Sequence, residues 1–319
     1  MKRVAAIIVS VALVVAFAFG IFFLVDSGGP DAATFGDVAI SQRYVDDELQ
    51  VIAENETLRD AVKKAQSSAL SNTEGSVTSM VGSGWLTLIV SQKFAAGAVE
   101  KQGFDVTEAD RKRGKELAKQ SVGTDDIYKS LPGWLQDRLV GRWTPVAVLE
   151  RQLTENPSPG FLAAITSQCP SGRYVSHILV ESEQEAVALK QQLDAGADFA
   201  KLAKANSIDQ GSAKQGGALG CIDGQSFVEP FATIAATQPI GVVSDPVATQ
   251  YGSHLLLVSD QPPASQLEQA AIQTALGQGR GAVVDVNPRY GTWDPNNGRV
   301  VPARVPGAPS APPAPAPTG

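Results

Sequence analysis

The residues best placed to do chemistry are two histidines, which are the only ones in a chain of 319 residues. His177 and His254 each lie in an apolar segment, RYVSHILV and GSHLLLV, and such segments predict strands. Asp209 lies between them in a glycine-rich loop, and Phe227 and Phe231 follow. Polar groups of this kind can hydrogen-bond around a carbonyl group, and the aromatic rings can form an apolar pocket beside it. Two histidines are too few for a His-rich metal centre.

Each of these residues also has an ordinary structural interpretation. A histidine in a strand is often a hydrogen-bonded core residue, and an aspartate in a glycine-rich loop is a common turn residue. The spacing of Phe227 and Phe231, four residues apart, is also that of two core residues on one helix face. The pair Gly216 and Gly217 does not form a phosphate-binding loop, because no Gly-Lys-Ser/Thr follows it.

The order of the motifs along the chain favours the functional interpretation of these residues over the structural one. The chain reads SHILV, then S-x-D, GGALG, FVEPF and finally T-x-x-G-x-H, all within residues 171–260. This order and spacing resemble the parvulin family of peptidyl-prolyl isomerases. The resemblance covers a whole parvulin domain and implies an α+β fold in which helices flank a four-stranded antiparallel sheet.

The resemblance also implies roles for individual residues. His177 and His254 would form a hydrogen-bonded pair in the sheet floor, and Asp209 would face the substrate carbonyl. The remaining expected binding residues are Leu219, Phe227, Phe231 and Thr249, of which the first three form the proline pocket. Rotation about an X-Pro bond faces a barrier of about 18–20 kcal/mol. Lowering it requires a site that binds the twisted amide better than either planar form, and it needs no cofactor or metal.

Two positions depart from the parvulin pattern. Ala218 replaces the usual acid of the GGDLG motif, and Ser253 replaces the aromatic residue that commonly precedes the second histidine. These changes predict a looser loop and a thinner pocket wall. They keep open an alternative function, an ATP-independent chaperone or binding protein whose parvulin domain is inactive.

Composition excludes several other classes of protein. The net charge of -7 and the pI near 5.0 argue against a nucleic-acid binder that relies on a basic surface. Two cysteines are too few for a disulfide scaffold or a four-thiolate zinc site. In an oxidising compartment we expect Cys169 and Cys221 to form a disulfide; the alternative is two small buried thiols.

The N-terminus predicts export. Lys2 and Arg3 precede 22 uncharged residues, 4–25, which as a helix would span about 33 Å and match a hydrocarbon core of about 30 Å. The two positive charges place the N-terminus in the cytoplasm and the rest of the chain outside. We favour an uncleaved signal-anchor in the cell membrane; the alternative is a cleaved signal and a secreted protein.

The remaining chain divides by its patterning. Helices are expected at 40–54, 57–70, 85–102, after a capping box at 107–110, and at 131–154 and 161–167, with a loop at 70–84. Strands at 173–180 and 252–260 then enclose helices at 181–195, 198–205 and 229–237, and a helix at 265–278 and a strand within 282–294 follow. The expected segments are a signal and flexible spacer (1–33), a helical domain (34–168), the isomerase domain (169–261), a returning segment (262–301) and a Pro/Ala-rich disordered tail (302–319).

This arrangement resembles the SurA and PrsA class of exported chaperone-foldases. The resemblance implies that the helical N-terminal domain and the returning segment pack together as a chaperone module with an apolar groove. The expected function is an extracytoplasmic peptidyl-prolyl cis-trans isomerase that assists the folding of exported proteins. Its expected partners are unfolded or newly exported proline-containing polypeptides and, through the N-terminal helix, the membrane.

Overall fold

The computed structural model describes residues 29–65, 76–222 and 227–302. The chain forms two compact units. Unit one contains residues up to Ala147 and from Ala275 onward, and unit two contains Val148–Thr274. The predicted signal at residues 4–25 and all but the first residue of the predicted tail at 302–319 lie outside the described residues.

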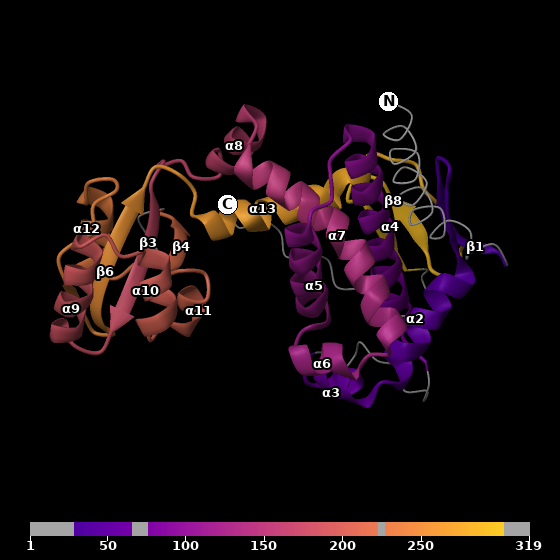
Figure 1. Ribbon diagram of the computed structural model, residues 1–319, viewed down its shortest axis with the longest axis horizontal. Coiled ribbons are helices and arrows are strands. Elements are labelled where there is room, and N and C mark those ends of the chain that lie inside the picture. The colour runs from indigo at the N-terminus through magenta and orange to yellow at the C-terminus, as the bar shows by residue number, and fades with distance from the viewer. Residues whose placement is uncertain (1–28, 66–75, 223–226, 303–319) are drawn as a thin grey trace, which may run out of the picture. The chain divides into compact units, whose positions relative to one another are not determined.

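Unit one is mainly helical, as expected (Figure 1). Its helices begin with α2 (Gln42–Glu54), α3 (Glu56–Ala65), α4 (Ser79–Gln102), α5 (Glu108–Val122), α6 (Asp125–Ser130) and α7 (Gly133–Glu155), the last of which runs on into unit two. Its other elements are the strands β1 (Asp31–Phe35), β2 (Val38–Ser41), β7 (Asp285–Val286), β8 (Thr292–Asp294) and β9 (Arg299–Val301), and the 3-10 turn η2 (Gly277–Gly279).

Local capping explains where several of these helices begin. The Ser41 hydroxyl accepts a hydrogen bond from the backbone N–H of Tyr44 at the start of α2. At the start of α5, Thr107 and Asp110 form the predicted reciprocal capping box. Helix α4 ends at Gly103, whose left-handed conformation (φ 67°) suits a residue without a side chain.

Two expectations for unit one are wrong. Residues 79–84, predicted to belong to a loop, form the first turns of α4, because Thr78 caps the helix there. Residues 31–33, predicted to be flexible spacer, lie in strand β1, where Ala32 and Ala33 are buried. That strand pairs with β2 and with β7, about 250 residues later in the chain, so its partner cannot be read from the local sequence.

The C-terminal segment packs on the N-terminal helices within unit one. The backbone N–H of Asn287 donates to the carbonyl of Ala32, and that of Val300 donates to the Thr87 hydroxyl. Val286 and Val300 join the core formed by β1, α2 and α4. These two ends of the chain therefore build one core, although the whole of unit two separates them in sequence.

A buried ion pair lies inside unit one. The carboxylate of Glu48, which is fully buried, accepts hydrogen bonds from Arg142 at 2.9 Å and from the indole N–H of Trp85 at 2.7 Å. Arg138 lies 3.4 Å from the same carboxylate and stacks over the Tyr44 ring. This group joins α2, α4 and α7 through charge-assisted hydrogen bonds.

Unit two contains the predicted four-stranded antiparallel sheet, in the order β4-β3-β6-β5 (Figure 1). Its strands are β3 (Tyr174–Val180), β4 (Ala218–Cys221), β5 (Val247–Thr249) and β6 (Gly252–Ser259). Its helices are α8 (Pro159–Thr166), α9 (Glu183–Asp194), α10 (Phe199–Asn206), α11 (Gln210–Ala213), α12 (Phe231–Thr237) and α13 (Ala264–Leu276), which ends in unit one.

The two faces of this sheet carry different helices. Ile178, Val180 and Leu255 pack with residues of α9 and α10. Val175 and Leu256, on the opposite face, pack with residues of α12. This division follows from the alternation of side chains along β3 and β6, and it leaves the face of α12 for the site.

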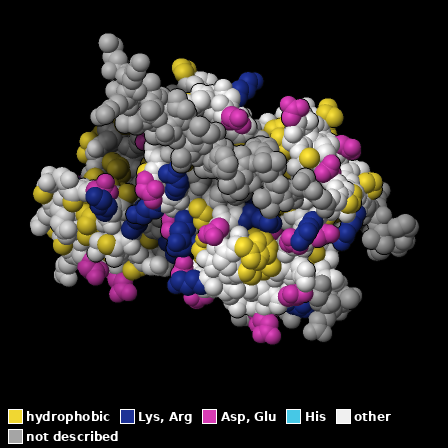
Figure 2. Space-filling view, turned by 45° about the vertical axis from the view of Figure 1, so that its right-hand side comes forward, with side chains coloured by type: hydrophobic (Ala, Val, Ile, Leu, Met, Phe, Trp, Pro, Cys, Tyr) yellow, Lys and Arg dark blue, Asp and Glu magenta, His cyan; other side chains and the backbone are white. Residues whose placement is uncertain are grey.

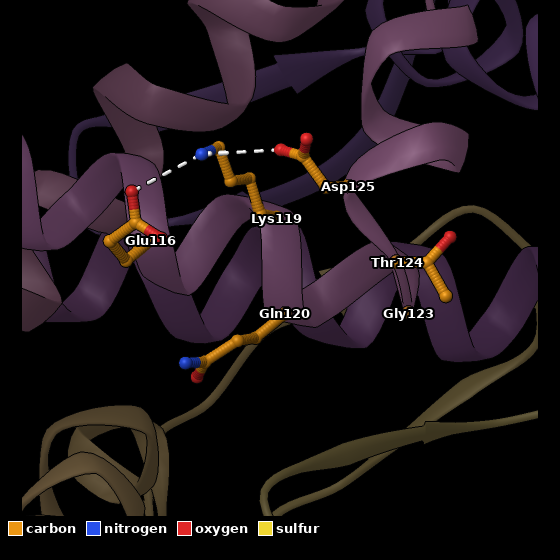
Figure 3. A pocket seen from close by; sticks show the side chains of 6 residues that line it. All are labelled: Glu116, Lys119, Gln120, Gly123, Thr124 and Asp125. Carbon is orange, nitrogen blue, oxygen red and sulfur yellow. Dashed lines mark hydrogen bonds and ion pairs between the residues drawn. The ribbon is translucent and has the colours of Figure 1, made fainter.

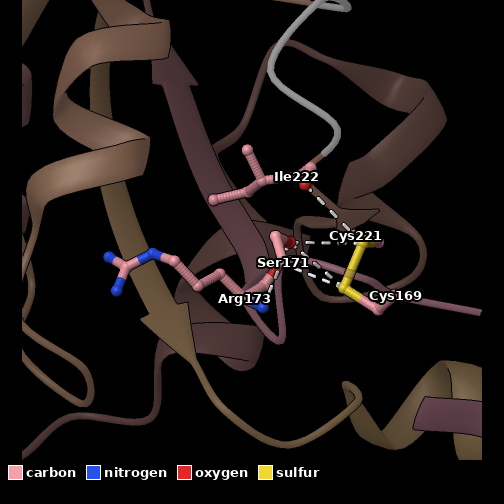
Figure 4. The surroundings of a disulfide bond; sticks show 5 residues. All are labelled: Cys169, Ser171, Arg173, Cys221 and Ile222. Carbon is pink, nitrogen blue, oxygen red and sulfur yellow. Dashed lines mark hydrogen bonds between the residues drawn. A yellow bond between two sulfur atoms is a disulfide. The ribbon is translucent and has the colours of Figure 1, made fainter. Parts of the chain in front are cut away.

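A disulfide joins Cys169 to Cys221 across 52 positions of the chain. It connects the segment that enters β3 to the end of β4, and Ser171 lies beside it (Figure 4). Leu219, one of the predicted pocket residues, is two residues from Cys221 on the same strand.

Surface charge is mixed rather than gathered by sign. On the face seen in Figure 2, basic and acidic side chains lie interspersed around small apolar patches. Within the ranges that the structure describes, no helix has the length and apolarity needed to cross a bilayer.

Candidate active site

Strand pairing brings the two histidines together. In the β3–β6 register, His177 is opposite Leu256 and His254 is opposite Leu179, so the histidines are diagonal neighbours on one face. Their Nδ1 atoms are 3.1 Å apart, and both side chains are buried. The sequence predicted this pair, and the structure places it in the sheet floor.

Asp209 reaches the pair from the start of α11. Its Oδ1 accepts a hydrogen bond from the Gly211 N–H, which fixes the carboxylate at the helix N-terminus. Its Oδ2 lies 2.9 Å from Nε2 of His177. The carboxylate is therefore placed at the outer end of the histidine pair.

Ser212 is a site residue that the sequence analysis missed. Its hydroxyl donates to Oδ2 of Asp209 at 2.6 Å and lies 3.0 Å from Nε2 of His177. It is buried, one helical turn beyond Asp209. The spacing of three residues was visible in the sequence, but a serine in a glycine-rich loop is too common to single out.

Thr249 completes the network from the other side. Its hydroxyl lies 2.8 Å from Nε2 of His254 and accepts a hydrogen bond from the backbone N–H of Tyr251. The short turn between β5 and β6 therefore holds the threonine against the histidine.

The hydrogen-bond partners fix the direction of each proton. An ionised Asp209 can only accept, so Ser212 donates to it and Nε2 of His177 carries a proton. Nδ1 of a neutral His177 then accepts, so Nδ1 of His254 donates to it. Nε2 of His254 must accept in turn, and Thr249 donates. With both imidazoles neutral, these two tautomers satisfy the network throughout.

The electrostatics of the site favour that state. Burial, followed by the charge of the neighbouring His177, lowers the pKa of His254 to about 4, although Asp209 opposes the change. Burial also lowers the pKa of His177, against the hydrogen bond and charge of Asp209. The hydrogen bond from Ser212, followed by that from His177, lowers the pKa of Asp209 to about 2 despite partial burial. At neutral pH the site thus carries one negative charge.

An aromatic wall stands over the histidines. The Phe231 ring meets His177 and His254 edge-on, with ring centroids 5.9 and 5.2 Å away. Phe227 lies 5.0 Å from Phe231, and the partly buried Leu219 packs in the same cluster. The structure therefore brings all seven predicted site residues together. They form an apolar wall beside a polar floor.

The backbone around Gly217 explains why the GGALG motif has a glycine at this position. Its φ of +83° suits glycine, and a Cβ there would overlap the carbonyl oxygen of His177. The N–H of His177 donates to the Gly217 carbonyl at 2.8 Å. Ala218 and Ser253, the two departures from the parvulin pattern, contribute no hydrogen bond to the network described above.

A separate pocket of about 370 Å³ lies in unit one, where α5 meets α6 (Figure 3). Lys119 crosses it and pairs with Glu116 and Asp125, so its polar groups bind one another. It contains no predicted site residue. In the described ranges, no group of three or more His, Cys, Asp or Glu side chains is arranged to hold a metal ion.

Comparison with known proteins adds a family. Residues 176–260 match the family described as a PPIC-type PPIase (rotamase) domain. The foldase PrsA 3 of Bacillus cereus is 30% identical over 203 residues, which cover 57% of this chain and 68% of that protein. The chaperone SurA of Burkholderia pseudomallei is 30% identical over 213 residues, covering 60% of this chain and 46% of that protein.

Other relatives match over shorter stretches. PrsA of Exiguobacterium sibiricum is 44% identical over 120 residues, which cover 36% of this chain and 40% of that protein, so the chain spans well under half of that relative. The crystal structure of PrsA from Bacillus subtilis is 22% identical, with a TM-score of 0.37 over 79% of this chain and 91% of that one.

Proposed function

This chain belongs to the PrsA family of foldases with a PPIC-type domain, and we propose that it is a peptidyl-prolyl cis-trans isomerase that assists protein folding outside the cytoplasm. The observation that supports this most is the closed hydrogen-bond network of Asp209, His177, His254 and Thr249 beneath the Phe231 ring. Its two histidines are buried and its Asp209 and Thr249 are half-buried, every member is hydrogen-bonded, and the network lies beside an apolar wall that suits a proline ring.

The reaction needs no bond to break. The planar X-Pro amide is stabilised by a resonance form that places negative charge on the carbonyl oxygen. A carboxylate facing that oxygen disfavours the planar form, and the aromatic wall holds the proline ring while the carbonyl rotates. Catalysis is then preferential binding of the twisted amide.

In this proposal each residue has a distinct role. Asp209 faces the carbonyl, and Phe231 with Phe227 and Leu219 binds the ring. His177 and His254 hold Asp209 and the floor in place as neutral groups, and Thr249 fixes their orientation. Ser212 is a positioning residue, because it acts through Asp209.

A protease-coupled isomerase assay on the full chain with X-Pro tetrapeptides tests the proposal. Asp209→Asn keeps the shape but removes the charge, and we expect kcat/KM to fall roughly tenfold or more. Phe231→Ala should lower it by about 10–100-fold. Phe199→Ala is the matched control, since Phe199 belongs to the core on the opposite face of the same sheet. While the protein stays folded, its activity should remain within about twofold of wild type. No acceleration by the folded wild type would contradict the proposal.

The second candidate function is an ATP-independent chaperone whose isomerase site is inactive. Ala218 and Ser253 favour it, whereas the intact network favours the enzyme. We propose that unit one supplies client binding in either case, because it unites the helical N-terminal part and the returning segment that the family resemblance implies. The test is whether the Asp209→Asn variant suppresses the aggregation of an unfolded protein as well as the wild type does. If it does, the chaperone activity is separate from the isomerase activity.

The proposed location is outside the cytoplasm, with the basic residues Lys2 and Arg3 and the apolar stretch 4–25 as its support. The signal-anchor, and the boundaries of the five predicted segments, remain predictions. Fractionation of cells, followed by protease treatment of intact cells or spheroplasts, tests the location.

A further inference from the structure

The segments that carry Asp209, Phe227, Phe231 and Thr249, together with the segment that directly follows β3, contain carboxylates and no basic residue. These segments are residues 181–185, 206–213, 227–231 and 247–253. Their acidic residues are Glu181, Glu183, Glu185, Asp209 and Glu229. When the nearest basic residues along the chain, Lys204 and Lys214, are counted with these segments, the sum is three negative charges. A cationic group on a bound polypeptide would be attracted to this end, and an anionic one repelled.

Three of these segments meet at the end of β3. The backbone N–H of Ile208 donates to the carbonyl of Leu179 at 2.8 Å. A Cβ on Gly252 would overlap the carbonyl of Val180, so the turn that carries Tyr251 abuts the same point. Glu181 is the next residue along the chain. Ile208, Tyr251 and Glu181 therefore surround one end of the strand that carries His177.

The side chains at this point combine apolar and acidic character. Ile208 is 44% exposed and Tyr251 is 60% exposed, and both are among the large apolar residues that the structure leaves open to solvent. Glu181, which directly follows β3, and Glu183, two residues further along the chain, are also exposed. Lys and Arg present the complementary combination, an apolar stem with a cationic head that also binds an aromatic face.

The position of the cation in the substrate follows from the proposed function, on which this inference rests. The proline ring occupies the wall of Phe231 and Phe227, and the rotating carbonyl belongs to the residue before proline and faces Asp209. The side chain of that residue therefore extends past the polar end of the site. The geometry points to a substrate preference for Lys or Arg immediately before proline, with discrimination against Glu, Asp and phosphorylated residues.

The charge state of the floor supports this inference. With both imidazoles neutral and Asp209 ionised, the floor adds to the negative potential of the rim and does not cancel it. Glu185 and Glu229 accept hydrogen bonds from Ser182 and Thr233. Glu181 and Glu183 are therefore the residues to test.

The experiment measures kcat/KM of the full chain on peptides that differ only before proline, with Lys, Arg, Leu or Glu there. At about 10 mM salt we expect the Lys and Arg peptides to exceed the Glu peptide by roughly tenfold. The ratio should fall severalfold at about 500 mM salt, because ions screen exposed charges. Glu181→Lys and Glu183→Gln should each lower the Lys-to-Glu ratio, the former by about threefold or more.

Asp260→Lys is the matched control. Asp260 is exposed in the same unit, directly after the end of β6 and six residues from His254, and so about 20 Å away. At about 150 mM salt, where the Debye length is about 8 Å, it should leave the ratio within about 1.5-fold of wild type measured at the same salt. Equal rates on all four peptides, or a preference for Glu, would overturn the inference and leave the isomerase function standing. Acceleration of no peptide would overturn both, and circular dichroism would show that the sample is folded.

Discussion

The tautomers and pKa values of the histidine pair give the sharpest test of the site. We expect the imidazole of His177 to carry its proton on Nε2 and that of His254 on Nδ1, with both rings neutral at pH 7. Lowering the pH perturbs this arrangement. With a pKa of about 4, His254 would be about 3% protonated at pH 5.5, whereas a histidine at its usual 6.5 would be about 90% protonated.

The same shift has a consequence for stability. Between pH 6.5 and pH 4 the unfolded chain binds a proton that the folded site does not, so the stability present above pH 6.5 is lost as the pH falls. The shift of His254 corresponds to about 3 kcal/mol. Asp209 acts in the same direction at lower pH, because its carboxylate is protonated more readily in the unfolded chain.

Because the chain has only two histidines, nitrogen-15 labelling of histidine gives spectra of only these two rings. Nitrogen chemical shifts distinguish protonated from unprotonated ring atoms, and a pH titration gives both pKa values. Asp209→Asn should lower both, because the carboxylate stabilises the charged imidazoles. Asp260→Asn, directly after the end of β6, is the control and should leave both pKa values unchanged. A proton on Nδ1 of His177, or a His254 that titrates near 6.5, would refute the assigned network.

Three further predictions concern stability. Replacing Cys169 and Cys221 with serine should destabilise unit two by about 4 kcal/mol, because the unfolded chain gains the entropy that the closed loop denies it. A urea titration followed by isomerase activity would show this as a lower midpoint. An unchanged urea midpoint would contradict the prediction. Glu48→Gln breaks a buried ion pair and should lower the free energy of unfolding of unit one by about 3 kcal/mol. All four tryptophans lie in that unit, so their fluorescence during denaturation measures this loss. An unshifted midpoint would count against the prediction. Gly217→Ala should destabilise unit two more than Gly241→Ala does, since both have positive φ but only the first would overlap a backbone carbonyl; equal midpoints in urea would rule out that reasoning.

Much of unit two could be predicted from the sequence. The alternation in RYVSHILV and the apolar run after His254 gave β3 and β6, and the spacing of GGALG and FVEPF placed the pocket residues between them. The short strands β4 and β5 were missed, and residues 218–220 of β4 were predicted to belong to a glycine-rich loop, because three or four residues carry too little periodicity to predict a strand. Ser212 was missed for a similar reason, since only its contacts with Asp209 and His177 distinguish it.

Unit one shows which features of the fold local sequence patterns do not predict. Most helices of residues 42–155 follow from caps and apolar spacing, although α6 and the first turns of α4 were not predicted. Residues 31–33 of β1 were predicted to be a spacer, because their alanines look unspecific without their partners. The buried pair of Glu48 and Arg142 joins residues 94 positions apart, and each looks like an ordinary surface charge in its own helix. Long-range pairing of this kind leaves no local signal.

The sequence by itself determined the residue types of the site, the order of the isomerase motifs and the presence of a mainly helical region before them. These features depend on local spacing, which the chain carries in a single stretch. Only the tertiary structure decided the directions of the protons in the network, the closure of unit one by the returning C-terminal strands, and the meeting of Ile208, Tyr251 and Glu181 at the end of β3. Each of these depends on the register between distant segments, and that register is set by burial and hydrogen bonding across the whole fold.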